Sequence, residues 1–363
     1  MMSTAVERLA QALPQEINGV PIDAAMITSD KNRRYLTGFP STDGVVFVTR
    51  EQSYFLTDFR YAEAAEKQID TCKVVMYTRL SESIQEIISR HHVRGVLFEN
   101  EKLSLGNAKR HEDILASAGA TAIENTTLDN LLCNLRMIKS PEEIQKIKDS
   151  QKITDAAFEH VLPMIKIGAT ERDIALEIEF FMRKQGADGV AFDLIVVSGK
   201  NGSMCHGVPS SKKMEDGDFI TMDTGALLDG YHSDMTRTVA LGRVSEEQRN
   251  VYDTVLKAQL AALAAVKPGI ACGTVDAAAR DIIEKDYKGT FGHSTGHGVG
   301  IEIHEWPRFS SGDKVITKVG MVVTVEPGIY IPGKFGVRIE DMVAVTETGC
   351  ENLTHSPKEL IIL

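Results

Sequence analysis

Residues 222–238 read MDTGALLDGYHSDMTRT, and residues 324–341 read TVEPGIYIPGKFGVRIED. Each stretch contains two runs that suit β-strands, joined by residues typical of a tight turn. The turn residues are Asp229-Gly230 in the first stretch and Pro332 to Gly336 in the second. Dipeptides such as Asp-Gly between alternating strands are a strong hairpin signal. The two stretches therefore predict two antiparallel hairpins in the C-terminal part of the chain.

Four carboxylates are arranged about these turns. Asp223 and Asp234 lie about equally far from the first turn, and the ladder is expected to bring them opposite each other to within about one residue of register. Glu326 and Glu340 lie nearly symmetrically about the second turn. Like charges that face each other destabilise a sheet, and a free carboxylate is costly to bury. Solvated strand faces would explain one such pair, but two pairs within apolar strands predict that cations neutralise them.

A histidine-rich stretch, FGHSTGHGVGIEIHEWP at residues 291–307, supplies an imidazole. His293 and His297 are four residues apart, as in the HExxH zinc motif, but no glutamate follows His293. Four glycines within residues 292–300 also oppose a helix, so we expect an extended, tightly packed backbone. Six further histidines are expected to be satisfied core residues (His160, His232, His355) or surface helix residues (His91, His92, His111).

Four carboxylates with one imidazole form an oxygen-rich donor set. Such a set suits two hard or borderline divalent ions, such as Mn²⁺, Co²⁺ or Fe²⁺, better than a structural zinc ion, which prefers thiolates. Four negative ligands would also offset the charge of two dications. Because two metal ions that share a water are a hydrolytic device, the pattern indicates a metal-dependent hydrolase.

The composition sets the class of protein. A chain of 363 residues with 43% hydrophobic and 25% charged residues is typical of a soluble globular enzyme of about two domains. Its net charge of −11 argues against nucleic acid and acidic membrane surfaces as partners. The apolar runs are too short for a membrane span, and we expect no export signal. Five scattered cysteines, without a paired spacing, fit a reducing cytoplasm.

Two domains are expected, at residues 1–135 and 136–363. The first is expected to be α/β, because short apolar runs alternate with amphipathic stretches. Its strands are predicted at residues 22–28, 44–49, 53–57, 73–78, 95–99 and 121–124. In the second, a capping box at Ser140 starts a long helix, and boxes at Thr170, Ser245 and Thr274 start three more. These helices are predicted at about residues 141–160, 171–185, 246–266 and 275–286, packed on antiparallel hairpins in an α+β domain.

The motifs MDTGALLDGYHSDMTRT, GHSTGHGVGIEIHEWP (292–307), TVEPGIYIP (324–332) and VRIED (337–341) resemble those of the pita-bread metallopeptidases, in the same order and with similar spacing. The resemblance is to the proline-specific branch, Xaa-Pro dipeptidase (prolidase) and Xaa-Pro aminopeptidase (aminopeptidase P). NRRYLTGF (32–39) and FLTDFRYAEAA (55–65) extend it over the first domain. It implies a creatinase/prolidase-like N-terminal domain followed by a pita-bread catalytic domain. It also implies hydrolysis of the Xaa-Pro bond of short peptides by a metal-bridging hydroxide.

The same resemblance implies roles for individual residues. Two divalent ions would bind to Asp223, Asp234, His297, Glu326 and Glu340. Glu326 would also be the general acid/base, and His206 and His304 would position the substrate and stabilise the tetrahedral intermediate. His293 would line the pocket, and Arg338 would orient the carboxylates. Mn²⁺ is the expected ion, with Co²⁺, Fe²⁺ or Zn²⁺ as alternatives. A homodimer is expected, in which the N-terminal domain of one subunit helps to close the cleft of the other.

Arg308 bears on the choice between the two peptidases. A dipeptide that ends in proline carries a free carboxylate there, so a dipeptidase needs a cation near that pocket, and a guanidinium suits this role. Arg308 directly follows HEWP, which favours the dipeptidase, although it could also be a solvated surface residue. A creatinase-like hydrolase without metal and a non-catalytic binding protein are the alternatives from other classes. The presence of all five expected ligands argues against both.

Overall fold

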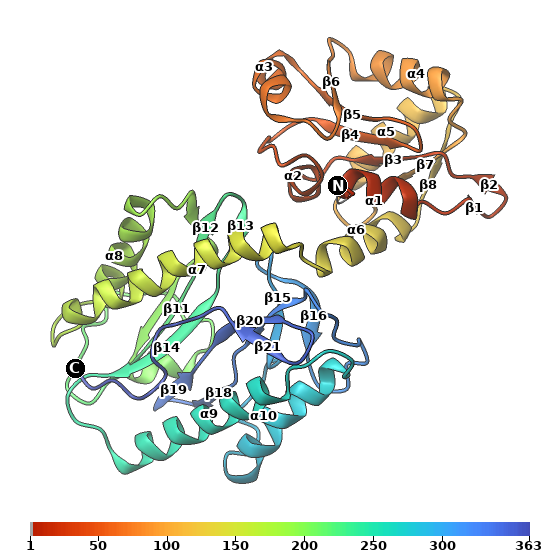
Figure 1. Ribbon diagram of the computed structural model, residues 1–363. Coiled ribbons are helices and arrows are strands. Elements are labelled where there is room, and N and C mark those ends of the chain that lie inside the picture. Colours follow the sequence, from red (N-terminus) through yellow and green to blue (C-terminus); the bar gives the residue numbers. More distant parts are fainter. Residues whose placement is uncertain (1–2) are drawn as a thin grey trace. The chain divides into compact units, whose positions relative to one another are not determined.

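The computed structural model describes residues 3–363. The chain divides into two compact units, of which the first ends at Arg136 and the second begins at Met137. Each unit is described by itself, and Figure 1 follows the chain from red to blue through both.

The first unit is built on a six-stranded mixed sheet with the order β6-β5-β4-β3-β7-β8. β3 and β7 run parallel at its centre, whereas β4 is antiparallel to both of its neighbours. The strands are β3 (Ala24–Ile27), β4 (Val45–Thr49), β5 (Ser53–Thr57), β6 (Lys73–Met76), β7 (Gly95–Phe98) and β8 (Thr121–Ile123). The helices are α1 (Ala5–Ala12), α2 (Asp30–Thr37), α3 (Phe59–Gln68), α4 (Leu80–His91), α5 (Leu105–Ser117) and α6 (Thr127–Met137).

All six strands predicted for the first unit are confirmed, most of them with slightly shorter ends. The continuous apolar runs of β3, β4 and β7 are buried along their whole length, as is typical of strands covered on both faces. One hairpin was not predicted. Its strands β1 (Glu16–Ile17) and β2 (Val20–Pro21) are joined by Asn18-Gly19, both with positive φ. The Asn-Gly dipeptide was the signal that could have found it.

The prediction that His111 lies on a helix surface is wrong. His111 and Leu115, one turn apart on α5, are both buried. Burial lowers the pKa of His111, so the ring is neutral at pH 7. His91 and His92 end α4, where His92 has the left-handed conformation of a C-cap. The amphipathic pattern of α5 is weak, which is why the buried face could not be assigned from the sequence.

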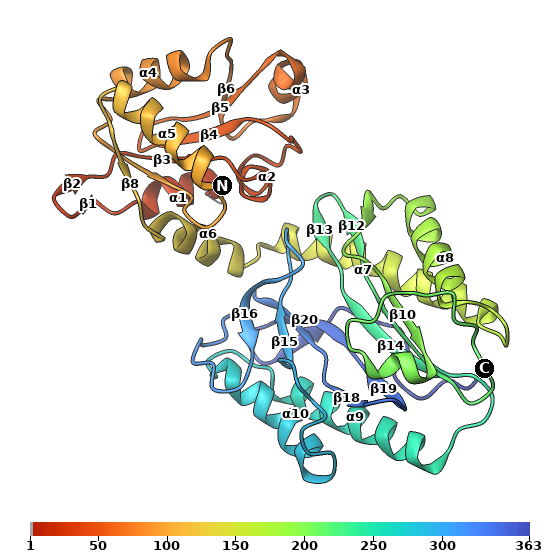
Figure 2. The same ribbon diagram turned by 180° about the vertical axis from the view of Figure 1, so that it is seen from behind.

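In the second unit, β-strands lie between two pairs of helices, α7 with α8 and α9 with α10 (Figures 1 and 2). The helices are α7 (Pro141–Val161), α8 (Glu171–Lys184), α9 (Glu246–Ala265) and α10 (Cys272–Asp286), with 3-10 turns η1 (Leu162–Met164) and η2 (Gly199–Ser203). The strands before α9 are β9 (Gly189–Val190), β10 (Ile195–Ser198), β11 (Phe219–Thr224), β12 (Ala226–Leu228), β13 (Tyr231–His232) and β14 (Met235–Ala240). Those after α10 are β15 (Gly296–Gly298), β16 (Glu305–Phe309), β17 (Val322–Val325), β18 (Gly328–Ile331), β19 (Phe335–Arg338), β20 (Asp341–Val345) and β21 (Cys350–Asn352).

The strands of the second unit form antiparallel sheets with the orders β10-β11-β14, β13-β12-β9, β16-β15-β17-β20-β21 and β18-β19. Two hydrophobic cores hold the helices on these sheets. One lies between α9, α10 and the strands after them, and the other lies between α7, α8 and the strands before α9. The strands of the two hairpins therefore pack against a helix pair on each side.

Three of the four predicted capping boxes are confirmed, at Ser140, Thr170 and Ser245. The prediction that α10 starts after Thr274 is wrong, because it begins at Cys272 and no side chain caps it. Instead, the backbone N–H groups of Cys272 and Gly273 donate to the carbonyls of Val315 and Asp313. A tertiary contact thus satisfies the free N–H groups of the first turn, which local sequence could not indicate.

Among the described residues, no helix combines the length and apolar character that a membrane span requires.

Candidate metal centre

The four carboxylates lie where the hairpin strands pass from one sheet to another. Asp223 is the penultimate residue of β11, and Asp234 lies between β13 and β14. Glu326 lies between β17 and β18, and Glu340 between β19 and β20. At such breaks the strand bends, and its side chains are freed from the regular alternation of a flat ladder. Both hairpins therefore direct acidic side chains toward one interior space.

The predicted register holds for the second hairpin and is wrong for the first. Gly328 pairs with Arg338 and Val325 with Asp341, so Glu326 lies opposite Glu340. In the first hairpin, Asp223 pairs with Thr236, two residues beyond Asp234. The physical reason is the two-residue turn at Asp229-Gly230, in which both residues have positive φ and which fixes Leu228 opposite Tyr231.

His297 points its Nε2 atom at this acidic cluster. Nε2 lies 3.5 Å from Oδ2 of Asp234 and 3.5 Å from Oε1 of Glu326. The Nδ1–H group donates to the carbonyl of Gly298 at 3.0 Å, since a carbonyl can only accept. Burial lowers the pKa of His297 to about 4, so the ring is neutral at pH 7 and presents a lone pair to the carboxylates. That is the form in which an imidazole binds a metal ion.

The charge of the cluster is only partly compensated by the described residues. Burial and the neighbouring carboxylates raise the pKa of Asp234 and Glu340 well above the usual range. Burial likewise raises the pKa of Glu326, to about 8. The Oδ1 atom of Asp223 is buried and has no hydrogen-bond partner among the described residues. Ligand atoms of Asp234, His297 and Glu340 lie within 4.8 Å of one another. This donor set fits divalent cations.

Arg338 connects three of the surrounding groups. Its guanidinium donates to Oδ2 of Asp223 at 2.6 Å, to the Thr236 hydroxyl at 3.0 Å and to the Tyr330 hydroxyl at 2.8 Å. The Thr236 hydroxyl in turn donates to Oε2 of Glu340 at 2.7 Å. Arg338 therefore orients one carboxylate directly and a second through Thr236, while leaving their other oxygens free.

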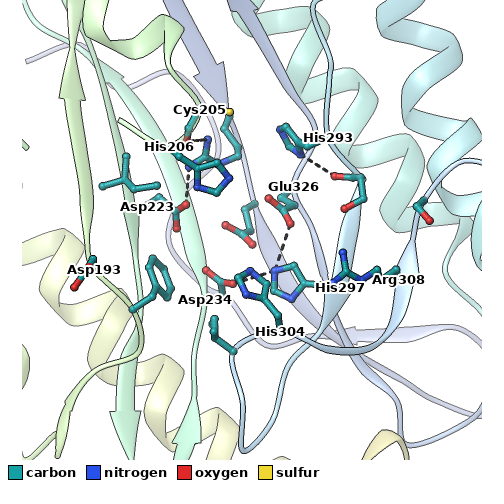
Figure 3. Close-up of a pocket in the computed structure, with 17 residues that line it drawn as sticks. Asp193, Cys205, His206, Asp223, Asp234, His293, His297, His304, Arg308 and Glu326 are labelled. Carbon is teal, nitrogen blue, oxygen red and sulfur yellow. Dashed lines mark hydrogen bonds and ion pairs between the residues drawn. The ribbon is translucent and has the colours of Figure 1, made fainter. Parts of the chain in front are cut away.

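All ten residues predicted for the site line one cavity of about 690 Å³ (Figure 3). They are Asp223, Asp234, His297, Glu326, Glu340, His206, His293, His304, Arg308 and Arg338. The rest of the wall was not predicted, and it is formed by Phe192, Asp193, Ile195, Cys205, Ser294, Ile303 and Ser310. Nothing in the run AFDLIVV at residues 191–197 indicates which of its residues face a cavity, and Cys205 is one of five scattered cysteines without a distinguishing pattern.

The histidines around the cavity differ in what they can offer. The His304 ring packs edge-on against His297 with centroids 4.5 Å apart, and His206 is exposed at the cavity. Both ring nitrogen atoms of His293 already have hydrogen-bond partners: Nδ1 bonds to the Ser294 carbonyl and Nε2 to the Tyr330 hydroxyl. His293 thus contributes its ring edge to the wall and has no N–H group left for a ligand.

An α+β domain with paired helices around antiparallel hairpins, and a buried set of carboxylates and one imidazole between them, defines a metal-dependent hydrolase. Comparison with known proteins makes this specific. Residues 145–347 match metallopeptidase family M24, and residues 8–138 match the creatinase/prolidase N-terminal domain. The chain belongs to metallopeptidase family M24, in the pita-bread fold with a creatinase-type N-terminal domain.

Three relatives show how far the similarity extends. The Xaa-Pro dipeptidase of Pyrococcus furiosus is 38% identical over 94% of this chain and 95% of its own. The solved Xaa-Pro dipeptidase from Bacillus anthracis superimposes with a TM-score of 0.93, at 42% identity and 99% coverage of both chains. The X-Pro aminopeptidase from Thermotoga maritima superimposes with a TM-score of 0.86, at 36% identity, over 94% of this chain and 96% of its own.

Metal binding is expected to release protons, with an apparent affinity that rises with pH up to about 8. Because the pKa of Glu326 is about 8, this residue holds a proton at neutral pH in the metal-free cluster, and a bound cation displaces it. The raised pKa values of Asp234 and Glu340 act in the same direction. As the pH rises toward the pKa of Glu326, fewer protons remain to be displaced, so binding tightens. Calorimetric titration of the metal-free protein with Mn²⁺ in two buffers of different ionisation enthalpy measures this release. Binding heats that do not depend on the buffer would contradict it.

Proposed function

We propose that this chain is an Xaa-Pro dipeptidase with two divalent ions held by Asp223, Asp234, His297, Glu326 and Glu340. The observation that carries the choice of substrate is Arg308. Its side chain lines the same cavity as the acidic cluster, on the strand position paired with His297. Arg308 is an exposed residue, and its guanidinium is not engaged in an ion pair with any carboxylate of the described residues. An unpaired guanidinium within a small peptide's length of the metal ligands suits the free carboxylate of a C-terminal proline.

The chemistry divides between the ions and the protein. When bound, two divalent ions lower the pKa of a shared water and polarise the scissile carbonyl. Glu326 lies beside His297 at the edge of the cluster, where it can take up a proton and deliver it to the departing proline nitrogen. His206 and His304 donate hydrogen bonds where negative charge develops on the carbonyl oxygen. Burial lowers the pKa of His304, so at neutral pH this ring donates as a neutral imidazole.

We also propose Mn²⁺ as the resident ion, a homodimeric assembly and a cytoplasmic location. The oxygen-rich donor set supports Mn²⁺. The five cysteines are widely scattered in the sequence without a paired spacing, which supports a reducing compartment. The similarity to proline-specific peptidases is the ground for the homodimer. Metal analysis of the purified protein, light scattering and cell fractionation test these three proposals in turn.

Arg308→Ala is expected to lower kcat/KM for Ala-Pro. The expected loss of transition-state stabilisation is about 1.5–3 kcal/mol, the range of a charge-assisted hydrogen bond. Cleavage of Ala-Pro-Ala should be spared, because its proline carries no free carboxylate. The measurement is steady-state kinetics on both peptides with saturating Mn²⁺, with Ala-Ala as the substrate that lacks proline. Arg243→Ala is the matched control, since Arg243 is exposed, pairs with Asp216 and does not line the cavity.

Two results would move the assignment to Xaa-Pro aminopeptidase. One is a wild-type enzyme that prefers Ala-Pro-Ala to Ala-Pro. The other is an Arg308→Ala variant that loses the same factor on both peptides, which would mean that Arg308 does not read the terminal carboxylate.

A further inference from the structure

An ion pair on α10, between the buried Asp276 and the partly buried Arg280, contacts the stretch of chain that precedes His297. Asp276 and Arg280 are one turn apart, and the guanidinium meets the carboxylate with two parallel bonds, Nε to Oδ2 and Nη2 to Oδ1, both at 2.8 Å. Asp276 is 1% exposed. Such a bidentate arrangement fixes the guanidinium plane as well as its position.

Asp276 and Arg280 also form hydrogen bonds with residues 291–295, which precede His297. Arg280 donates to the carbonyls of Phe291 and His293, each at 2.8 Å. Oδ1 of Asp276 accepts from the backbone N–H of Thr295 at 3.2 Å and from its hydroxyl at 2.9 Å. The guanidinium also lies over the Phe291 ring, 4.3 Å from its centroid. Thr295 is also held by a neighbouring strand, because its backbone N–H donates to the Phe309 carbonyl at 2.8 Å. Residues 291–294 precede β15, and Arg280 anchors the carbonyls of two of them, Phe291 and His293.

Thr295 lies next to two expected metal ligands, His297 and Glu326. It lies two residues before His297, and its carbonyl accepts the backbone N–H of Glu326 at 2.8 Å. Thr324 closes the connection from the other side: its hydroxyl accepts the N–H of His297 at 3.1 Å and donates to Oε1 of Glu326 at 3.3 Å. Thr295 and Thr324 thus link the strand that carries His297 to the segment that carries Glu326.

We infer that Asp276 and Arg280 are positioning residues for the metal centre, which hold His297 and Glu326 at their binding distance through Thr295. This rests on the proposed function, because it concerns the metals that the five ligands hold. Neither residue lines the cavity, so the pair acts only through the backbone it holds. Partners of this kind that orient metal ligands typically change metal affinity by about 10–100-fold when they are lost.

Arg280→Lys tests the inference. Lysine keeps the positive charge beside Asp276 but cannot reproduce the planar fork with two further donors to carbonyls. Mn²⁺ affinity of the variant, measured by calorimetric titration of the metal-free protein, should fall about 10–100-fold. A second variant, Thr295→Val, keeps the shape and removes only the hydroxyl that donates to Asp276; its affinity should fall in the same direction by a smaller factor. Thermal melts of the metal-free variants report whether the fold is kept.

Arg183→Lys is the matched control. Arg183 on α8 also pairs with a carboxylate one turn away, Glu179, and also donates to a backbone carbonyl, that of Asp188. It lies outside the cavity wall, so the metal affinity of this variant should stay within about twofold of wild type. Arg280→Lys and Thr295→Val with wild-type affinity, or an equal loss in Arg183→Lys, would overturn the positioning role. A wild-type protein that binds no metal would instead overturn the proposed function.

Discussion

Glu340→Ala is expected to lose both bound metal and measurable hydrolysis of Ala-Pro. Glu340 is 1% exposed, and a carboxylate oxygen of Glu340 lies within 4.8 Å of ligand atoms of Asp234 and His297. Glu340 is one of the five residues that would hold the two ions, and its removal should therefore weaken metal binding at the site. The remaining carboxylates then repel one another, because less bound positive charge compensates their negative charges. Asp234→Ala is expected to behave in the same way, and Glu326→Gln to cripple turnover.

The fold of the Glu340→Ala variant should stay largely intact, because one member of a mutually repelling cluster has been removed and the helices that back the hairpins are untouched. Metal content per chain by mass spectrometry, a circular-dichroism melt and peptide kinetics measure the three properties together. Glu347→Ala, which removes an exposed carboxylate just after β20, is the control. Near-wild-type activity with two metals per chain in Glu340→Ala would refute the assignment of Glu340 as a ligand.

His304→Ala and His206→Ala are expected to lower kcat by about 10²–10³, the usual cost of removing one donor to a developing oxyanion. The metal content should be kept, since neither ring is among the expected ligands. His304 packs against His297 but is itself exposed on one side, as a group that must reach substrate has to be. His355→Ala replaces a histidine that does not line the cavity and should leave kcat unchanged.

Measuring metal content and kcat on the same two histidine variants tests this prediction. Loss of metal in either variant would mean that the histidine is a ligand. A rise in KM with an unchanged kcat would mean that it binds the substrate equally in the ground state and the transition state.

Local signals in the sequence predicted those parts of the fold that depend on short-range physics. The capping boxes at Ser140, Thr170 and Ser245 satisfy backbone donors within one turn, so four residues suffice to place each helix start. Asp229-Gly230 has the φ values that its turn type demands, which places the first hairpin. The carboxylates stood out because a charge within an apolar strand conflicts with burial.

The predictions that were wrong or missing concern features that depend on tertiary contacts. The start of α10 depends on carbonyls of Val315 and Asp313, which are about forty residues away in the chain. His111 is buried in the folded unit, and the helical pattern of α5 alone does not show this. Phe192 lies between β9 and β10 and Cys205 follows η2, so both reach the cavity from connecting segments that have no periodic pattern in the sequence. The contacts of Asp276 likewise became visible only in the structure.

The breaks at which the carboxylates lie separate each hairpin into a base and a tip. In the second hairpin the base pairs Val325 with Asp341, and the tip ends at the turn between Ile331 and Phe335. Because the base sets the spacing of Glu326 and Glu340, residues added at Gly333 would lengthen an exposed loop without shifting either ligand. A single residue inserted into β18 or β19 would instead reverse the facing of Tyr330 or Arg338. The hairpin therefore offers one permissive point for insertions, natural or engineered, beside strands whose length is under strict constraint.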